Sequence, residues 1–400
     1  MYSNNEVLEF VKEEDVKFIK LAFVDVFGKQ KNVSITDNEL DRAFKTGVAI
    51  DASAIKGFGD EAKSDLFLHP DPSTLSILPW RPEHGRVVRM FCDITYPDGT
   101  PFECDSRLIL KNAVKAAEER GLSFSFGSEM EFYLFKLDEN GNRTNETYDN
   151  AGYMDVAPED KGENIRREIC LTLEQMGIYP ESSHHEEGAG QNEIDFRYSD
   201  ALTAADDAIT FRQVVSAVAN RNGLYADFSP KPIENAAGNG FHINFSVKSK
   251  SGEVLPNAIA GIMSKIKDCT VFFNNSENSY KRLGVNKAPI FIAWSKENRS
   301  ELIRIPAADG DYKRAELRSP DPLSNPYIAF ALIIYSAIDG ISAKSKLPEP
   351  ADFNMYKADE ETLKKFDKLP ATLNDAKKKA SQSDFIKTHL PKAMISAYTD

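Results

Sequence analysis

Residues 123–135 read SFSFGSEMEFYLF, and this stretch predicts a buried strand that carries two carboxylates. Glu129 and Glu131 are two residues apart, so on a strand both side chains project from one face while Met130 points to the other. Two like charges this close are unfavourable unless a cation or a shared proton compensates them. Glu-x-Glu pairs are also common on solvated sheet faces, but the flanking phenylalanines make this strand too apolar for an exposed edge. The pair is therefore a candidate metal site.

A second informative stretch, residues 184–195, reads HHEEGAGQNEID. A turn at its glycine-rich centre could bring Glu186 and Glu193 to one cation as hard oxygen ligands. A polar surface loop is the alternative interpretation. For Glu187 and Asp195, we expect positions in solvent or in salt bridges.

A third stretch, residues 238–247, reads GNGFHINFSV and predicts a strand that follows closely spaced glycines. His242, Asn244 and Ser246 alternate along it and therefore share one face. Glycines such as Gly238 allow the backbone to approach a ligand closely. A lone histidine on a strand is more often structural than a ligand, so His242 alone does not define a metal site.

Arginines gather in the C-terminal half of the chain around Glu316. They are Arg282, Arg299, Arg304, Arg314 and Arg318. An arginine can hold a carboxylate or a phosphate through two parallel hydrogen bonds, which suits phosphoryl transfer. A solvated network of ion pairs is the alternative.

Together these stretches predict an oxygen-rich ligand set, which favours Mg²⁺ or Mn²⁺ over zinc. Carboxylate-held metals that bridge a triphosphate, with arginines neutralising the transferred group, are typical of phosphoryl transfer. The chain has neither a GxxxxGK[ST] loop nor a protein-kinase signature, so neither scaffold fits. From spacing alone, a metal-dependent hydrolase remains open.

Composition narrows the class of protein. The 400 residues are 41% apolar and 28% charged, which predicts a folded chain of two or three domains. A net charge of −13 argues against a nucleic-acid partner. The apolar runs are too short to span a membrane, and the first residues lack the pattern of a signal peptide. The four cysteines show no CxxC spacing, which argues against a cysteine-zinc site. We expect a cytoplasmic protein without nucleic-acid or membrane partners.

Strand and helix signals divide the chain into a β-rich N-terminal part and a larger part in which strands and helices alternate. Segment 16–35 predicts two strands joined by a turn at Phe27-Gly28, and we place the domain boundary near residues 100–105. From residue 359 onward, we expect a polar helical tail with little core character. Other expected elements are an irregular connection over 69–82, helices over 106–120, 163–176, 203–222, 257–274 and 326–341, and a strand over 289–295.

The motifs resemble those of the glutamine synthetase family, class I. The resemblance covers about residues 7–373 and rests on DASAIKGF, EMEF, HHEEGAGQNEI, KPIENAAGNGFHINFS, NSYKRL, NRSELIRIP and RAELRSPDPLSNPYIAFA, which follow in the family order. It implies an α+β fold with a small β-grasp-like N-terminal domain (1–101) and a large catalytic domain (102–400) with a curved antiparallel sheet, a half-barrel flanked by helices. It further implies a homo-oligomer, either a hexameric ring or stacked rings, and an unusually short C-terminus.

The resemblance also implies an ATP-dependent ligase that makes γ-glutamyl phosphate from glutamate and amidates it with ammonia. Residues matching the metal ligands are Glu131, Glu186 and Glu193 for one ion, and Glu129, His242 and Glu316 for the other. Residues matching the glutamate site are Arg282, Gly238, His242 and Arg318. Those matching the phosphate and nucleotide sites are Arg299, Arg304, His184, Asn244 and Ser246. Asp51 matches a carboxylate on the ammonium side, and with Arg299 and Arg318 it completes the expected catalytic residues.

Three positions depart from the family pattern. Lys287 stands where the family has a flap glutamate that helps to form the ammonium pocket. A unit charge about 5 Å away interacts by roughly 3 kcal/mol at an effective dielectric constant of about 20, so this change disfavours a bound cation. Ala237 replaces an asparagine expected near glutamate, and Asn244 replaces a histidine expected near the nucleotide. A lost hydrogen bond costs only about 1 kcal/mol, so these two changes tune the site.

The departures keep two alternatives open beside glutamine formation. One is a γ-glutamyl ligase that uses an organic amine or a related acid. The other is a non-catalytic family member that binds ATP. Retention of all six metal-ligand residues favours an enzyme, because a binding protein does not need a mutually repelling carboxylate cluster.

Overall fold

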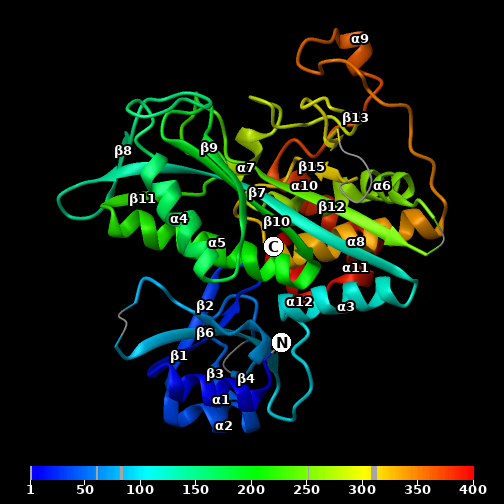
Figure 1. The fold of residues 1–400 in the computed structure, drawn as a ribbon. Coiled ribbons are helices and arrows are strands. Elements are labelled where there is room, and N and C mark those ends of the chain that lie inside the picture. Colours follow the sequence, from blue (N-terminus) through cyan, green and yellow to red (C-terminus); the bar gives the residue numbers. More distant parts are fainter. Residues whose placement is uncertain (1, 60–61, 82–83, 251, 308–312) are drawn as a thin grey trace.

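The N-terminal part of the protein is built on a mixed sheet, drawn in blue in Figure 1. The computed structural model describes residues 2–59, 62–81, 84–250, 252–307 and 313–400. The strand order is β2-β1-β6-β4-β3 with β5 on β6, and β1 runs parallel to β6. The elements are α1 (Asn4–Glu13), β1 (Val16–Val24), β2 (Gln30–Thr36), α2 (Leu40–Thr46), β3 (Val48–Asp51), β4 (Asp65–Pro70), β5 (Ser76–Ile77) and β6 (Arg86–Thr95).

The β1–β2 hairpin turns at Phe27-Gly28, as the sequence predicts. Gly28 has a φ of 77°, a conformation that glycine adopts without steric cost. The Asp25 carboxylate accepts hydrogen bonds from the amides of Phe27 and Lys29 at 3.1 and 2.9 Å, which closes the turn. A Cβ at position 28 would lie 2.7 Å from the Asn325 Cα, so the turn is packed directly against the larger part of the molecule.

The larger part holds a nine-stranded sheet centred on the long strand β7 (Leu122–Leu137). Its order is β13-β14-β15-β12-β7-β10-β9, and β8 and β11 also pair with β7. Among the described residues of this sheet, only β13 and β14 pair in parallel. The other strands are β8 (Arg143–Thr147), β9 (Pro180–His185), β10 (Gln191–Asp200), β11 (Leu224–Asp227), β12 (Phe241–Ser249), β13 (Trp294–Lys296), β14 (Ile303–Ile305) and β15 (Ala315–Leu317). The expected α+β fold, with a curved and largely antiparallel sheet flanked by helices, is confirmed.

Helices pack on this sheet, and α8 (Pro326–Ser342) is buried along most of its length. Phe330 of α8 stacks on Phe126 of β7 with ring centroids 4.3 Å apart. The helix α6 approaches α8 so closely that a Cβ on Gly261 would lie 2.2 Å from the Ser336 carbonyl oxygen. The other helices are α3 (Ser106–Glu118), α4 (Glu163–Gln175), α5 (Ala201–Arg221), α6 (Leu255–Phe273), α7 (Glu277–Arg282), α9 (Glu360–Leu363), α10 (Leu373–Gln382), α11 (Asp384–His389) and α12 (Lys392–Thr399).

The five long helices expected from the sequence agree with the observed ones within two residues at each end. One expected strand and one expected connection differ from the observed elements. The predicted strand over 289–295 is reduced to the start of β13, because Ile290 and Ile292 hydrogen-bond to the segment 367–369 at 2.9 and 2.8 Å. The predicted irregular connection over 69–82 contains the end of β4 and all of β5.

The C-terminal tail belongs to the core, so the expectation of a polar tail with little core character is wrong. Tyr398 is buried between Phe27 and Phe272, with ring centroids 4.9 and 4.7 Å away. Its hydroxyl donates to the Val26 carbonyl oxygen at 2.9 Å. Lysines dominate the tail sequence, but α10, α11 and α12 all contact α6, so their few apolar residues converge on one surface.

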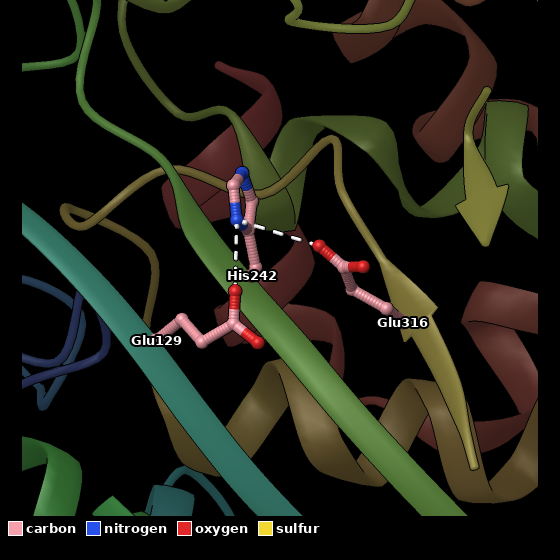
Figure 2. A group of neighbouring side chains, drawn as sticks. All are labelled: Glu129, His242 and Glu316. Carbon is pink, nitrogen blue, oxygen red and sulfur yellow. Dashed lines mark hydrogen bonds and ion pairs between the residues drawn. The ribbon is translucent and has the colours of Figure 1, made fainter. Parts of the chain in front are cut away.

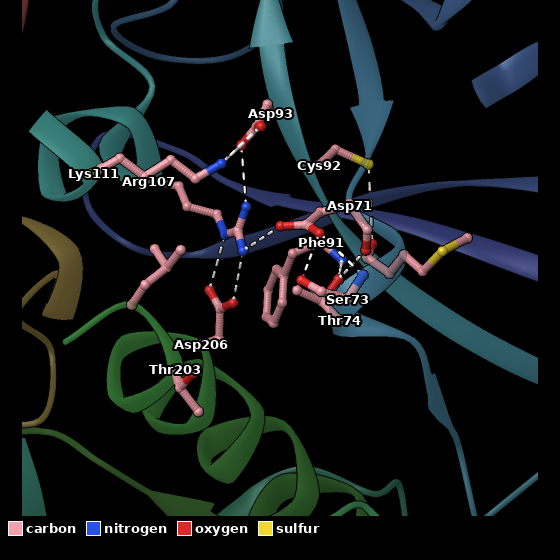
Figure 3. Close-up of polar contacts among 12 residues, drawn as sticks. Asp71, Ser73, Thr74, Phe91, Cys92, Asp93, Arg107, Lys111, Thr203 and Asp206 are labelled. Atoms are coloured by element: carbon pink, nitrogen blue, oxygen red, sulfur yellow. Dashed lines mark hydrogen bonds and ion pairs between the residues drawn. The ribbon is translucent and has the colours of Figure 1, made fainter. Parts of the chain in front are cut away.

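A group of charges around the buried Arg107 joins the two parts of the molecule, and we name it the Arg107 cluster (Figure 3). Arg107, at the start of α3, forms ion pairs with Asp71 and Asp93 of the N-terminal part at 2.9 and 3.1 Å. It also pairs with Asp206 of α5 at 3.1 Å, and Lys111 contacts Asp93 at 2.6 Å. Burial lowers the pKa of Arg107, but the charge of Asp206 overcomes this and raises it. The guanidinium therefore stays charged and ties three elements together.

Candidate active site

A cavity of about 600 Å³ opens in the larger part of the molecule, beside β7, the β9–β10 hairpin and β12. Polar and charged side chains from strands and loops form most of its wall. The expected site residues that line it are Glu129, Glu131, His184, Glu186, Glu193, Gly238, His242, Arg282, Arg299 and Arg318. The sheet therefore gathers in one place most residues that the sequence singled out.

Strand register is what brings the carboxylates together. Glu131 of β7 is directly opposite Glu193 of β10. Glu129 is opposite His242 of β12 on one side and Asp195 of β10 on the other. Direct cross-strand partners have Cβ atoms about 5 Å apart, so these side chains meet on one face of the sheet.

Glu129, His242 and Glu316 form one carboxylate–histidine group, from β7, β12 and β15 (Figure 2). The His242 Nδ1 atom lies 3.3 Å from a Glu129 oxygen and 3.5 Å from a Glu316 oxygen. Arg304 and Arg318 also donate to the Glu316 carboxylate at 2.9 and 3.0 Å. Burial raises the pKa of Glu316, but Arg318, His242 and Arg304 together bring it down to about 2. Glu316 is therefore a carboxylate anion held behind the cavity wall.

Glu193 is the centre of a second group. Its carboxylate lies within 4.8 Å of ligand atoms from Glu131 on one side and from His184 and Glu186 on the other. The His184 Nε2 atom is 3.1 Å from Glu186 and 3.7 Å from Glu193. Burial and the surrounding carboxylates raise the pKa of Glu193 well above its usual range. A bound cation would relieve this repulsion.

His185 and Asp149 support the turn that presents Glu186. The two nitrogens of the buried His185 ring lie 2.9 Å from an Asp149 oxygen and 2.7 Å from the Glu186 carbonyl oxygen. Asp149 also accepts hydrogen bonds from the amides of Gly190 and Lys161 at 2.9 and 3.1 Å. The backbone around Glu186 is therefore held in place from inside the protein.

Two glycines allow the close packing behind His242. A Cβ on Gly240 would lie 2.6 Å from the Nε2 atom of His242 and 2.9 Å from an Arg282 nitrogen. A Cβ on Gly238 would lie 2.5 Å from the Pro230 carbonyl oxygen. Any larger residue at either position would have to displace a group at the cavity wall.

Arg282 and Arg318 line the cavity and also hold the backbone around it. Arg282 is buried and donates to the Ser319 carbonyl oxygen at 2.8 Å. Arg318 donates to the Lys287 carbonyl oxygen at 3.1 Å and also to the carbonyl oxygen of Arg299. These bonds connect the arginine wall to the loop that carries Lys287.

Beyond His242, β12 continues with Asn244 and Ser246, which lie outside the cavity lining. The Asn244 amide donates to Glu129 at 2.7 Å and accepts from the Arg314 Nε atom at 3.1 Å. Ser246 lies opposite Ser125 of β7. Asn244 therefore connects the first carboxylate group to Arg314.

Asp51 lies apart from the cavity, at the end of β3 in the N-terminal sheet. Its exposed carboxylate accepts hydrogen bonds from the amide and hydroxyl of Ser53 at 3.0 and 2.6 Å. Within one chain, the described residues do not bring Asp51 to the carboxylate groups.

The expectation for Asp195, a position in solvent or in a salt bridge, is wrong. Asp195 lines the cavity, and its Oδ1 atom has no hydrogen-bond partner within the described part of the chain. Burial and the charge of Glu129 raise its pKa to about 7. The signal was present, because Asp195 alternates with Glu193, but the sequence predicted a turn here and not the strand β10 that carries both residues. Gln191, which donates to Glu131 at 3.2 Å, was missed for the same reason.

The donor set fits hard divalent cations. Carboxylate oxygens outnumber imidazole nitrogens in both groups, as magnesium and manganese prefer. The raised pKa of Glu193 and the partnerless oxygen of Asp195 indicate the same, because a bound cation would stabilise the ionised form of both carboxyl groups.

Comparison with known families agrees with this geometry. A model of the glutamine synthetase catalytic domain matches residues 103–400, and a model of the glutamine synthetase β-grasp domain matches residues 15–97. The chain belongs to the glutamine synthetase family. The catalytic match extends beyond residue 373, where the resemblance seen in the sequence ended.

Glutamine synthetases are also found among individual relatives. That of Clostridium saccharobutylicum is 44% identical over 405 residues, covering 97% of this chain and 91% of the relative. That of Methanosarcina mazei is 43% identical over 412 residues, covering 99% and 92%. The solved structure of GmaS in complex with ADP superposes with a TM-score of 0.88 at 27% identity, covering 98% of this chain and 93% of that one. Plasmodium falciparum glutamine synthetase has the same fold, with a TM-score of 0.87 at 23% identity and coverage of 100% and 95%.

Membership of the glutamine synthetase family supports the expected enzyme class, an ATP-dependent glutamate–ammonia ligase. The family generally uses ATP and divalent metal ions, and the cavity provides acidic groups for such ions. The hydrolase that spacing alone left open gains no support from these relatives. In the described part of the chain, each helix is too short or too polar to cross a membrane.

Proposed function

We propose that this member of the glutamine synthetase family joins glutamate and ammonia at the cost of ATP, with the chemistry in the cavity beside β7, β10 and β12. The observation that carries the proposal is the convergence of two carboxylate groups on a cavity that also holds Arg299 and Arg318. Such carboxylates can bind the cations that accompany a triphosphate, while arginines face the transferred phosphoryl group.

Two divalent cations, magnesium or manganese, are part of the proposal. The proposed ligands are Glu131, Glu186 and Glu193 for one ion, and Glu129, His242 and Glu316 for the other. When bound, the ions would neutralise phosphate oxygens of ATP and so favour attack on the γ-phosphorus. Because Arg304 and Arg318 already contact Glu316, they are placed to orient that carboxylate toward a metal.

The reaction has two steps. In the first, an oxygen of the substrate γ-carboxylate attacks the γ-phosphorus of ATP, and ADP leaves with the electron pair of the broken P–O bond. In the second, the nitrogen of ammonia attacks the carbonyl carbon of γ-glutamyl phosphate, a proton leaves the nitrogen, and phosphate departs with the electrons of the C–O bond. Arg299 and Arg318 would stabilise the transferred phosphate, while Arg282 and Gly238 would hold glutamate.

The nucleotide is proposed to lie along the face of the sheet that continues from the cavity. Residues proposed to contact it are His184, Asn244, Ser246 and Arg304. Structural similarity to GmaS in complex with ADP supports a nucleotide site in this fold.

Assembly into a homo-oligomer, a hexameric ring or two stacked rings, is proposed to complete the site. The exposed carboxylate of Asp51 lies far from its own cavity, so a neighbouring copy would have to supply it. This assignment fits a chain divided into an N-terminal domain (1–101) that carries Asp51 and a catalytic domain (102–400) that carries the metal ligands.

A second candidate function is γ-glutamyl transfer to an organic amine. The observation that favours it is Lys287, which lines the cavity and forms an ion pair with Glu187. A fixed ammonium group at the wall repels a small cation, so ammonium is not the only amine to be considered. Ala237, which also lines the cavity, leaves more room than a larger polar residue.

Phosphate release from ATP is the test of both functions. The protein is assayed with magnesium or manganese, glutamate, and either ammonium or a panel of alkylamines, and the amide product is identified by mass spectrometry. Ammonium-dependent formation of glutamine would establish the first function. Turnover with organic amines alone would establish the second, and no turnover with any amine would contradict both and favour an ATP-binding role without catalysis.

A further inference from the structure

Two loops that face each other across the cavity are joined by an ion pair. The ammonium of Lys287, on the loop after α7, contacts the carboxylate of Glu187, in the turn between β9 and β10. The two residues are 100 positions apart in the chain. The same ammonium lies 5.7 Å from the ring centroid of Tyr153, a third lining residue.

The Lys287 loop is held in place from several sides. Its backbone carbonyl accepts a hydrogen bond from Arg318 at 3.1 Å, and the neighbouring Asn286 amide donates to the Ala236 carbonyl oxygen at 3.2 Å. Asn286 and Lys287 have φ angles of 45° and 65°, a conformation that non-glycine residues adopt only when their surroundings require it. The loop geometry therefore directs the lysine to this position.

Glu187 and Tyr153 provide the chemistry of a site for an organic cation. A carboxylate supplies the opposite charge, and an aromatic ring attracts a cation through its π-electrons. Tyr153 in turn stands edge-on to the His184 ring at 5.5 Å, next to the second carboxylate group. A cation bound here would lie at the rim of the cavity in which we place the γ-glutamyl phosphate.

The ion pair is exposed enough to exchange. The Lys287 and Glu187 side chains are 52% and 37% exposed, and ion pairs at such positions are weak and screened by salt. A second ammonium group with similar chemistry can therefore compete with Lys287 for the same carboxylate.

We propose that Lys287 is a built-in competitor of the amine substrate: its ammonium occupies Glu187 and is displaced when a primary alkylammonium ion binds there. The inference rests on the ligase function proposed above and specifies how its amine is selected. Ammonium carries the charge that Lys287 presents to Glu187 and to the Tyr153 ring, and a short alkylammonium ion reproduces in addition the carbon to which the lysine nitrogen is bonded. The Lys287–Glu187 pair thereby lowers the apparent affinity for every amine by the same factor.

The test is steady-state phosphate release with ammonium, methylammonium and ethylammonium at saturating ATP and glutamate. Removing the competitor in Lys287→Met should lower the KM for each amine about fivefold, the factor that corresponds to a weak ion pair. Glu187→Gln should raise the KM for the alkylammonium ions by a similar factor, and the double variant should behave like Glu187→Gln alone. The KM values for ATP and glutamate should not change, which also shows that the variants are folded.

A matched control is the Lys136–Glu146 pair of the β7–β8 hairpin, whose side chains are 50% and 73% exposed and lie away from the cavity. Lys136→Met and Glu146→Gln should leave all amine KM values unchanged. The inference is overturned if the wild type is active but Lys287→Met and Glu187→Gln leave the amine KM values unchanged, or shift the KM for glutamate equally. A wild type that releases no phosphate with any amine overturns the proposed function itself, and the inference falls with it.

Discussion

The Arg107 cluster and the cavity are both rich in carboxylates, but they differ in how charge is compensated. In the Arg107 cluster, Asp71, Asp93 and Asp206 each have a cation within 3.1 Å, from Arg107 or Lys111. In the cavity, carboxylates face one another across β7 and β10, and burial together with this repulsion raises the pKa of Glu193.

The difference separates a structural role from a chemical one. Removing one partner of a compensated buried cluster leaves its counter-charges stranded, which is strongly destabilising. Removing one member of a repelling cluster relieves repulsion and should leave folding intact. The uncompensated carboxylates of the cavity fit the proposed binding of an external cation, whereas the Arg107 cluster contains its own cations.

The largest effect is expected from Glu193→Gln in the cavity. Glu193 is a proposed metal ligand, and a bound metal contributes several kcal/mol of charge stabilisation, so kcat/KM for phosphate release should fall about 1,000-fold. The free energy of unfolding in EDTA should stay the same or rise, because a repelling charge has been removed. Activity within about tenfold of wild type, or a marked loss of stability, would show that Glu193 belongs with the structural carboxylates.

The converse change is Arg107→Met, which should lower the free energy of unfolding by about 3 kcal/mol because three aspartates lose their shared partner. Lys111→Met is the matched control: its contact with Asp93 is about one-third and one-half exposed, so the loss should be about 1 kcal/mol or less. Urea denaturation measures both. Equal losses for the two variants would mean that the cluster is not organised around Arg107.

A smaller effect is expected from Asp149, which supports the turn of Glu186 through His185 but is not a proposed metal ligand. Asp149→Asn should weaken the hydrogen bonds of His185 and the Gly190 turn, and so reduce the affinity for Mn²⁺ about tenfold without abolishing activity. Asp155→Asn is the control in the same loop, since Asp155 accepts from the Gly152 amide on the exposed side. Titration with Mn²⁺ compares them, and matching affinities in all three proteins would contradict a positioning role for Asp149.

A pH-dependent effect tests the charge balance around the Arg107 cluster. Burial raises the pKa of Asp105 to about 7 from 3.8, with Asp93 adding to the shift. Because the pKa of Asp105 is higher in the folded state, its contribution to the free energy of unfolding is fully present below pH 4. This contribution is lost as the pH rises through about 7. The free energy of unfolding of the wild type relative to Asp105→Asn should therefore fall from pH 4 to pH 8. A difference that stays constant across this range would show that Asp105 does not titrate there.

Much of the fold and of the candidate site could be predicted from the sequence because the signals are local. Glu129 and Glu131 share a face by strand alternation, and the long helices follow from apolar periodicity and end signals. The turn between Glu186 and Glu193 likewise follows from the glycines between them. What local signals could not supply is register: Asp195 joins the cavity only because β10 pairs with β7 so that it faces Glu129.

By itself, the sequence determined the family, the order of the metal-ligand motifs and the position of most helices, since each depends on neighbouring residues. Only the tertiary structure decided which distant groups meet. It paired Lys287 with Glu187 across the cavity, left Asp51 outside it, and packed Tyr398 beneath the N-terminal hairpin. The physical reason is that such contacts depend on strand register and helix packing, which bring together residues whose separation along the chain carries no local signal.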